Sequence, residues 1–114
     1  MVIDWQLKNN GEIVINSENQ KVKCINEIIY YNDEYGNHEV DITKKIYRKK
    51  NNNENIEIDF ENSLLTISFD DKNLKFDIET KYNINGNDIE LIYFIGDDEK
   101  VIKITRKEGI WKIY

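Results

Sequence analysis

The sequence predicts an all-β domain with mainly antiparallel strands, and two patterns support this fold class. Apolar and polar residues alternate with a period of two along most of the chain, as in strands that bury one face. Short clusters of Asn, Asp and Gly interrupt the alternation roughly every 8–12 residues. These residue types accept the left-handed backbone of tight hairpin turns. No segment has a sustained helical period, although residues 2–8 could form a short helical turn.

Each expected strand is an alternating run that ends at a turn cluster. In NIEIDFE, residues 55–61, the apolar side chains share one face and the acidic side chains share the other. In IELIYFI, residues 89–95, both faces are apolar, which predicts a strand that is covered on both sides. The expected strands are 2–8, 11–16, 21–31, 38–48, 55–61, 63–69, 73–82, 87–95, 100–106 and 110–114.

The strands follow one another closely, and no linker divides the chain. A length of 114 residues suits one domain with one core, so residues 1–114 are expected to form a single β domain. Closing the consecutive strands into a small barrel is the simplest way to remove exposed sheet edges. A β-sandwich is the alternative arrangement.

The composition restricts the partners. The formal net charge is −6, and an acidic surface repels nucleic acid and anionic lipid, so neither is expected as a partner. Cys24 is the only cysteine, which excludes an intrachain disulfide and fits a reducing cytoplasm. The first residues lack the pattern of a signal peptide, and no run is apolar enough to span a membrane. A cytoplasmic protein is expected, and an exported domain whose signal has been removed is the alternative.

The middle of the chain resembles a known family. NEIIYYNDEYGNHEV is similar to an aromatic strand that leads through acidic residues and a turn into the next strand, and KKIYRKK resembles a strand with one arginine, here Arg48. IEIDF and LKFDIETKYNINGNDIELIYFI resemble a strand ending at a threonine, here Thr80, and an apolar return strand with a tyrosine, here Tyr93. Over residues 20–106 the chain thus resembles small uncharacterised bacterial domains with a calycin-like, lipocalin-related β-barrel. The resemblance implies a barrel without known catalytic residues and supplies no ligand.

A basic strip interrupts the acidic chain, and it consists of Lys44, Lys45, Arg48, Lys49 and Lys50. A strand would divide these charges between its two faces, so the strip predicts a solvated strand end that enters an asparagine-rich loop. An acidic protein partner and a nucleic acid are the alternatives.

The segment NDEYGNHE offers Asp33, Glu34, His38 and Glu39 as possible metal ligands, but no second histidine or cysteine lies nearby. A polar hairpin turn is expected there, without a metal.

The sequence contains no catalytic fingerprint, neither a nucleophile elbow nor a phosphate-binding or dinucleotide-binding loop. Cys24 lies in an alternating strand, which predicts a buried structural thiol. The chain is therefore expected to be neither an enzyme nor a cofactor-binding protein. The expected function is that of a binding domain, with a small apolar ligand inside the barrel. The residues expected to line its cavity are Tyr30, Tyr82, Tyr93 and Phe94. The alternative is an acidic protein–protein interaction module, of the inhibitor or immunity type, that captures a basic protein.

Overall fold

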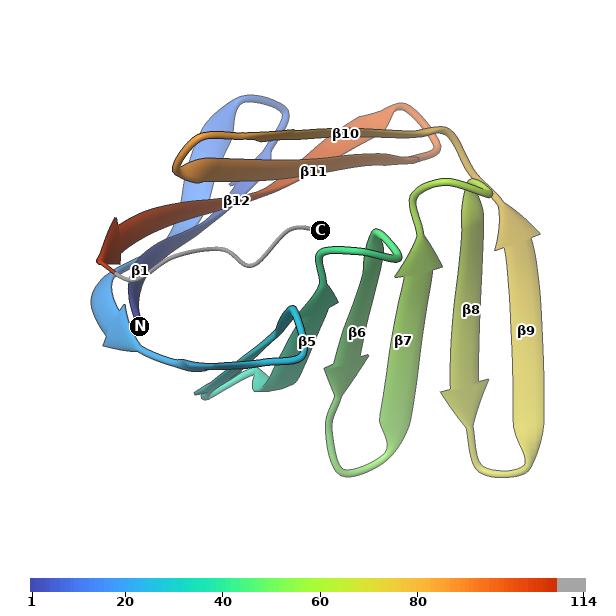
Figure 1. Cartoon of the computed structure of the whole chain (residues 1–114). Helices are drawn as coiled ribbons and strands as arrows, with labels where there is room; N and C mark the ends of the chain where they lie inside the picture. Colours follow the sequence, from blue (N-terminus) through green and yellow to red (C-terminus); the bar gives the residue numbers. More distant parts are fainter. Residues whose placement is uncertain (109–114) are drawn as a thin grey trace. The chain divides into compact units, whose positions relative to one another are not determined.

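The computed structural model describes residues 1–108 and confirms an all-β, antiparallel fold (Figure 1). The chain divides into two compact units, each with one sheet: residues 1–22 with 79–108, and residues 23–78. The expectation of one domain over residues 1–114 stays a prediction. The strands are β1 (Val2–Asn9), β2 (Glu12–Lys21), β3 (Lys23–Ile25), β4 (Ile28–Asp33), β5 (Gly36–Asp41), β6 (Ile46–Lys50), β7 (Glu54–Asp59), β8 (Leu64–Phe69), β9 (Lys72–Asp77), β10 (Thr80–Asn85), β11 (Asp88–Ile95) and β12 (Asp98–Glu108).

The five-stranded sheet belongs to the first unit and has the order β10-β11-β12-β1-β2. Residues that lie opposite each other in an antiparallel pair share a face of the sheet. Trp5 of β1 pairs with Ile104 of β12, which pairs with Ile89 of β11, and all three side chains are buried. Apolar alternation on neighbouring strands thus forms one continuous buried row, as the sequence pattern predicts.

The seven-stranded sheet belongs to the second unit and is a simple meander, with the order β3-β4-β5-β6-β7-β8-β9. Figure 1 shows β5 to β9 side by side, each joined to the next by a short turn. One face carries an apolar row that crosses the sheet through Ile29, Val40, Tyr47, Ile58 and Leu65, all of them buried. The opposite face is mainly polar.

Neither sheet closes on itself within residues 1–108. The five-stranded sheet ends at β10 and β2, and the seven-stranded sheet ends at β3 and β9. No backbone ladder joins β2 to β3 or β9 to β10, so the strand pairing of a closed barrel is not found in the described residues. Two open antiparallel sheets are consistent with the alternative that the sequence left open, a β-sandwich.

Three of the expected strands are each divided into two shorter strands. The run 21–31 breaks at Asn26 and Glu27, which both have positive φ, 52° and 62°, as a two-residue hairpin requires. The run 38–48 breaks between β5 and β6, where the Asp41 carboxylate accepts a hydrogen bond from the Lys44 amide at 3.0 Å. The run 73–82 divides between β9 and β10. A turn without glycine does not interrupt the alternation of apolar and polar residues, so the sequence pattern did not predict these turns.

The turn expected between the strands 11–16 and 21–31 is instead a β-bulge within a longer strand. The segment 16–19 continues β2, where Asn19 has φ 54° and its amide donates to the Asp4 carboxylate at 2.9 Å. The pairing of β1 with β2 shifts register at this place, which accommodates the extra residue.

The strand expected at 110–114 lies outside the described residues. The described part of the chain has no helix that is long and apolar enough to cross a membrane.

Candidate functional site

The four residues expected to line a ligand cavity lie on different surfaces. Tyr82 pairs with Leu91, and Tyr93 follows Leu91 by two positions, so both tyrosines face the same side of the five-stranded sheet. Phe94 faces the other side, where the Lys81 ammonium lies 5.9 Å from its ring centroid. Tyr30 lies in the other unit, on the polar face of the seven-stranded sheet.

Their burial differs as well. Tyr30 is 36% exposed and Tyr82 is 41% exposed, whereas Tyr93 and Phe94 are half-buried. Burial raises the pKa of Tyr93 above its usual value, because the phenolate is poorly solvated there. Adjacent residues of a strand cannot share a face, so Tyr93 and Phe94 cannot contact one ligand from the same side of their sheet. That these residues bind a ligand stays a prediction.

Three of the five residues of the basic strip, Lys45, Arg48 and Lys50, form ion pairs. Arg48 lies in β6 between two carboxylates: its Nε is 2.8 Å from Glu57 and its Nη1 is 3.8 Å from Glu39. Lys50 lies 3.9 Å from Glu39, and Lys45 lies 3.6 Å from Glu61. As expected, Arg48 and Lys50 share one face of the sheet, Lys49 points to the other, and the strip leads into the turn before β7. Cations that are already paired do not form the positive surface that phosphate binding requires.

His38 is the buried polar centre of the apolar face. It is 5% exposed and lies in β5 between Tyr31 of β4 and Tyr47 of β6, and its ring stacks on both, with centroid distances of 5.6 Å and 5.9 Å. Its Nδ1 lies 2.7 Å from the Tyr47 hydroxyl, and its Nε2 lies 2.8 Å from Asp33 Oδ1. A neutral imidazole fits both contacts, because Nε2–H can donate to the carboxylate while Nδ1 accepts from the hydroxyl.

The chain Asp33–His38–Tyr47 has the order of a catalytic relay, but its geometry favours a structural role. Tyr47 is only 5% exposed, so its hydroxyl is not presented to a substrate. A nucleophile must reach the reacting atom of the substrate, and this hydroxyl is directed at the imidazole instead. The relay therefore joins β4, β5 and β6 through one buried and one partly buried hydrogen bond.

Burial lowers the pKa of His38 below 6.5, and the hydrogen bond and charge of Asp33 oppose that shift only in part. The unfolded chain then binds more protons than the folded chain at pH values below about 6.5. We expect the free energy of unfolding to be highest above pH 6.5 and to fall as the pH is lowered towards the folded pKa. The slope from this one group cannot exceed about 1.4 kcal/mol per pH unit.

Urea unfolding of the wild type and of His38→Gln between pH 7.5 and pH 5 measures this effect, because the carboxylates that titrate in both proteins largely cancel in the difference. The stability advantage of the wild type over the variant should shrink on acidification. An advantage that grows as the pH falls would mean that the folded pKa of His38 is raised rather than lowered.

The four residues that the sequence offered as possible metal ligands are not gathered in one place. Asp33 and His38 lie together, but Glu39 points to the opposite face and pairs with Arg48. Among the described residues, no group of three or more His, Cys, Asp or Glu side chains could hold a metal ion.

Cys24, which was expected to be buried, is half-buried on the edge strand β3.

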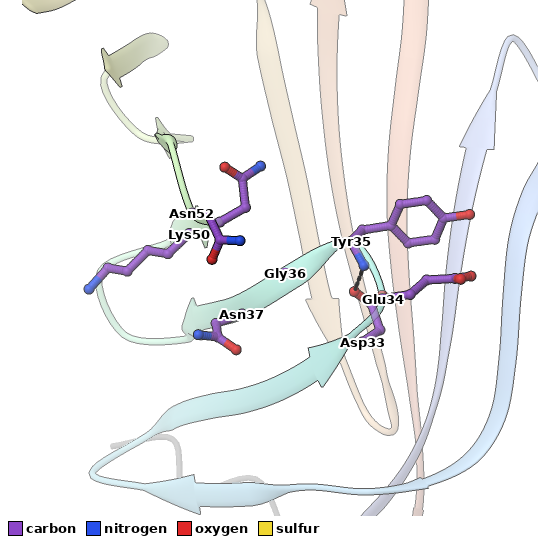
Figure 2. A pocket seen from close by; sticks show the side chains of 8 residues that line it. Asp33, Glu34, Tyr35, Gly36, Asn37, Lys50 and Asn52 are labelled. Atoms are coloured by element: carbon purple, nitrogen blue, oxygen red, sulfur yellow. Dashed lines mark hydrogen bonds between the residues drawn. The ribbon is translucent and has the colours of Figure 1, made fainter. Parts of the chain in front are cut away.

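A polar hollow of about 290 Å³ lies where the β4–β5 turn meets the β6–β7 turn (Figure 2). Figure 2 shows Gly36 at its centre, with the side chains of Lys50 and Tyr35 pointing to opposite sides. Asp33 connects this hollow to the buried histidine, since its Oδ1 also accepts a hydrogen bond from the Tyr35 amide at 2.9 Å. The hollow is lined by Asp33, Glu34, Tyr35, Gly36, Asn37, Lys50, Asn51 and Asn52.

A second hollow, of about 270 Å³, lies on the polar face of the seven-stranded sheet. Its lining comes from β6, β7 and β8 and consists of Arg48, Lys50, Asn55, Ile56, Glu57, Thr66 and Ser68. Lys50 lines both hollows. Sequence reasoning treated Arg48 and Lys50 as parts of a charged strip and missed Asn55, Thr66 and Ser68, because only strand register brings these side chains together.

The strand β9 is an unusual edge. Among residues 1–108 it pairs only with β8, and all six of its residues are exposed. Two of them are large and apolar: Leu74 is 42% exposed and Phe76 is 45% exposed. They alternate with polar residues, so both point to the face that carries the buried apolar row. An edge strand of this kind is a ready template for pairing with another chain.

Comparison with protein-family models, with curated protein sequences and with solved structures found no match to this chain. The resemblance to the calycin-like barrel family stays a prediction. The function is therefore argued from the described surfaces alone.

Proposed function

We propose that the chain is a non-catalytic interaction domain that binds an extended, basic segment of another protein by adding it as a strand next to β9. The observation that carries this proposal is the exposed edge itself, with Leu74 and Phe76 presented on one face. In strand addition, backbone hydrogen bonds supply affinity and pockets for alternate side chains supply specificity.

The charge of the chain favours a basic partner. The formal net charge is −6, and Asp70 and Asp71 form the turn that leads into β9. An acidic surface accelerates the encounter with a basic segment and makes the rate fall with added salt. The proposal is the interaction module that the sequence left as its alternative. A small apolar ligand inside a calycin-like barrel stays a prediction.

Strand addition needs backbone groups that point away from β8. The Ile78 amide donates to the Ser63 carbonyl at 3.1 Å, so the backbone of Ile78 faces β8. Because backbone groups alternate along an antiparallel strand, those of Phe76 and Leu74 also face β8, and those of Lys75 point outward. The outward amides of Asn73, Lys75 and Asp77 are therefore the donors that an added strand would use, and Lys75 is the central one.

We expect Lys75→Pro to weaken peptide binding at this edge, because proline removes the central outward N–H while the ladder with β8 stays intact. Peptides selected from a displayed random library on the wild type serve as probes, and their affinity is measured by fluorescence polarisation. The selected peptides should be basic with alternating apolar residues. Affinity should fall by at least about tenfold in Lys75→Pro and stay close to wild type in Lys75→Ala.

Equal binding of the selected peptides to Lys75→Pro and Lys75→Ala would contradict strand addition. Selection of acidic peptides, or affinity that does not change with salt, would contradict the basic partner. A wild-type dimer that Lys75→Pro converts to a monomer would assign the edge to a second copy of the chain instead.

A further inference from the structure

A row of amide and hydroxyl side chains crosses the polar face of the seven-stranded sheet. Residues that lie opposite each other on neighbouring strands share a face, and the registers align one residue from each of β5 to β9. The row consists of Asn37, Lys50, Asn55, Ser68 and Asn73. It joins the two hollows, because Asn37 and Lys50 line the first, and Lys50, Asn55 and Ser68 line the second.

The charges on this face nearly balance one another. Arg48 pairs with Glu57 and Glu39, and Lys50 lies 3.9 Å from Glu39. The strand registers place Lys23 and Lys75 on the same face, together with Asp41, Asp59 and Asp77, so four cations lie among five carboxylates and the net charge of the face is only −1. So small a net charge favours neither an anionic nor a cationic ligand.

The other polar groups of the row are amides and a hydroxyl, which can both donate and accept hydrogen bonds. The Ser68 hydroxyl donates to Asn73 Oδ1 at 2.6 Å, and its oxygen can still accept a hydrogen bond from a ligand.

These features suit a neutral ligand that is rich in hydroxyl groups. Neighbouring strands lie about 4.8 Å apart, so the row repeats its polar groups at an interval close to the length of one sugar unit in an extended chain. Tyr30 of β4 lies on the same face, opposite Glu39, and is 36% exposed, so a ligand that extends past β5 would meet an aromatic surface that suits the C–H face of a sugar ring. We infer that the polar face binds an extended, neutral oligosaccharide that lies across β5 to β8, with Asn55 and Ser68 at the centre of the site.

The inference goes beyond the proposed protein partner, because it uses a face of the sheet and not the edge of β9. The two are distinguishable by experiment. Lys75→Pro should leave oligosaccharide binding unchanged, and loss of the polar row should leave peptide binding at β9 unchanged.

Titration of the nitrogen-labelled protein with soluble cello-, xylo- and laminari-oligosaccharides, followed by amide NMR spectra, tests the inference. A heparin oligosaccharide serves as the anionic comparison. At least one neutral oligosaccharide should shift amide signals that gather on Asn37, Lys50, Asn55 and Ser68. The double variant Asn55→Ala, Ser68→Ala should bind it at least about tenfold more weakly, since two hydrogen-bonding side chains are removed.

Asn83→Ala is the matched control, because Asn83 is an exposed strand asparagine in the other unit. It should bind the oligosaccharide as the wild type does. The inference is overturned if no neutral oligosaccharide shifts the spectrum at millimolar concentration, if heparin alone binds, or if the double variant binds as tightly as Asn83→Ala. The replaced side chains are surface groups of their strands, so both variants should fold, and their thermal unfolding checks this.

Discussion

Gly36→Ala should lower the free energy of unfolding by about 3 kcal/mol, a large fraction of the stability of a small domain. Gly36 has φ 138°, a backbone conformation that alanine adopts only with strain. A Cβ atom at this position would lie 2.5 Å from the Lys50 carbonyl oxygen, which belongs to the neighbouring strand and cannot move aside like a side-chain tip. Urea unfolding followed by fluorescence measures the loss.

Gly96→Ala is the matched control for this prediction. Gly96 has φ 61° in the turn between β11 and β12, and an added Cβ would meet nothing within 4 Å. Alanine there carries only the cost of the left-handed backbone, about 1 kcal/mol. Equal losses for the two variants would mean that β5 and β6 do not approach each other closely at Gly36. A Gly36→Ala protein with wild-type stability would contradict the described geometry of the hollow.

His38→Ala should destabilise the protein by a similar amount, about 3 kcal/mol. The variant loses the hydrogen bonds to Tyr47 and Asp33 and leaves a cavity between the rings of Tyr31 and Tyr47. The Asp33 carboxylate, which is partly buried, loses the imidazole and keeps the Tyr35 amide as a hydrogen-bond partner. Chemical unfolding at pH 7.5, where His38 is neutral, measures the effect without the pH-dependent contribution.

His38→Gln separates the hydrogen bonds from the packing. A glutamine amide can donate to Asp33 and accept from Tyr47, so this variant should lose clearly less stability than His38→Ala. The NMR signals of the β4–β5 turn should shift in both variants, because Asp33 also holds the Tyr35 amide. If His38→Ala is as stable as the wild type, the imidazole is not the buried link between β4, β5 and β6.

Much of the fold could be predicted because strand alternation is a local property. The segments 55–61, 63–69 and 87–95 lie close to β7, β8 and β11, since each is an alternating or mainly apolar run that ends at a recognisable turn. The prediction of one strand over residues 21–31 was wrong, because the turn that divides it is formed by Asn26 and Glu27 and contains no glycine. Sheet closure could not be predicted either, because alternation records which face is buried and not which strands pair.

The candidate sites could be predicted from the sequence even less well than the fold. Residue type alone drew attention to Arg48 and His38, but their environments differ from their local sequence context. Arg48 is neutralised by Glu57, nine positions away, and by Glu39. His38 is buried between two tyrosines, although its neighbours in sequence are polar. Nothing in the sequence indicated that Asn55 and Ser68 belong to a site, because a single asparagine or serine in a strand is common.

The sequence by itself determined the all-β fold class, the antiparallel meander and the turn before β7, since all of these follow from periodicity and turn chemistry between near neighbours. Only the tertiary structure decided that the sheets stay open within residues 1–108, that β9 is an exposed edge and that an amide and hydroxyl row joins two hollows. These features depend on strand register, which brings together residues far apart in the chain. The local sequence states which face a side chain occupies, and register decides what lies beside it.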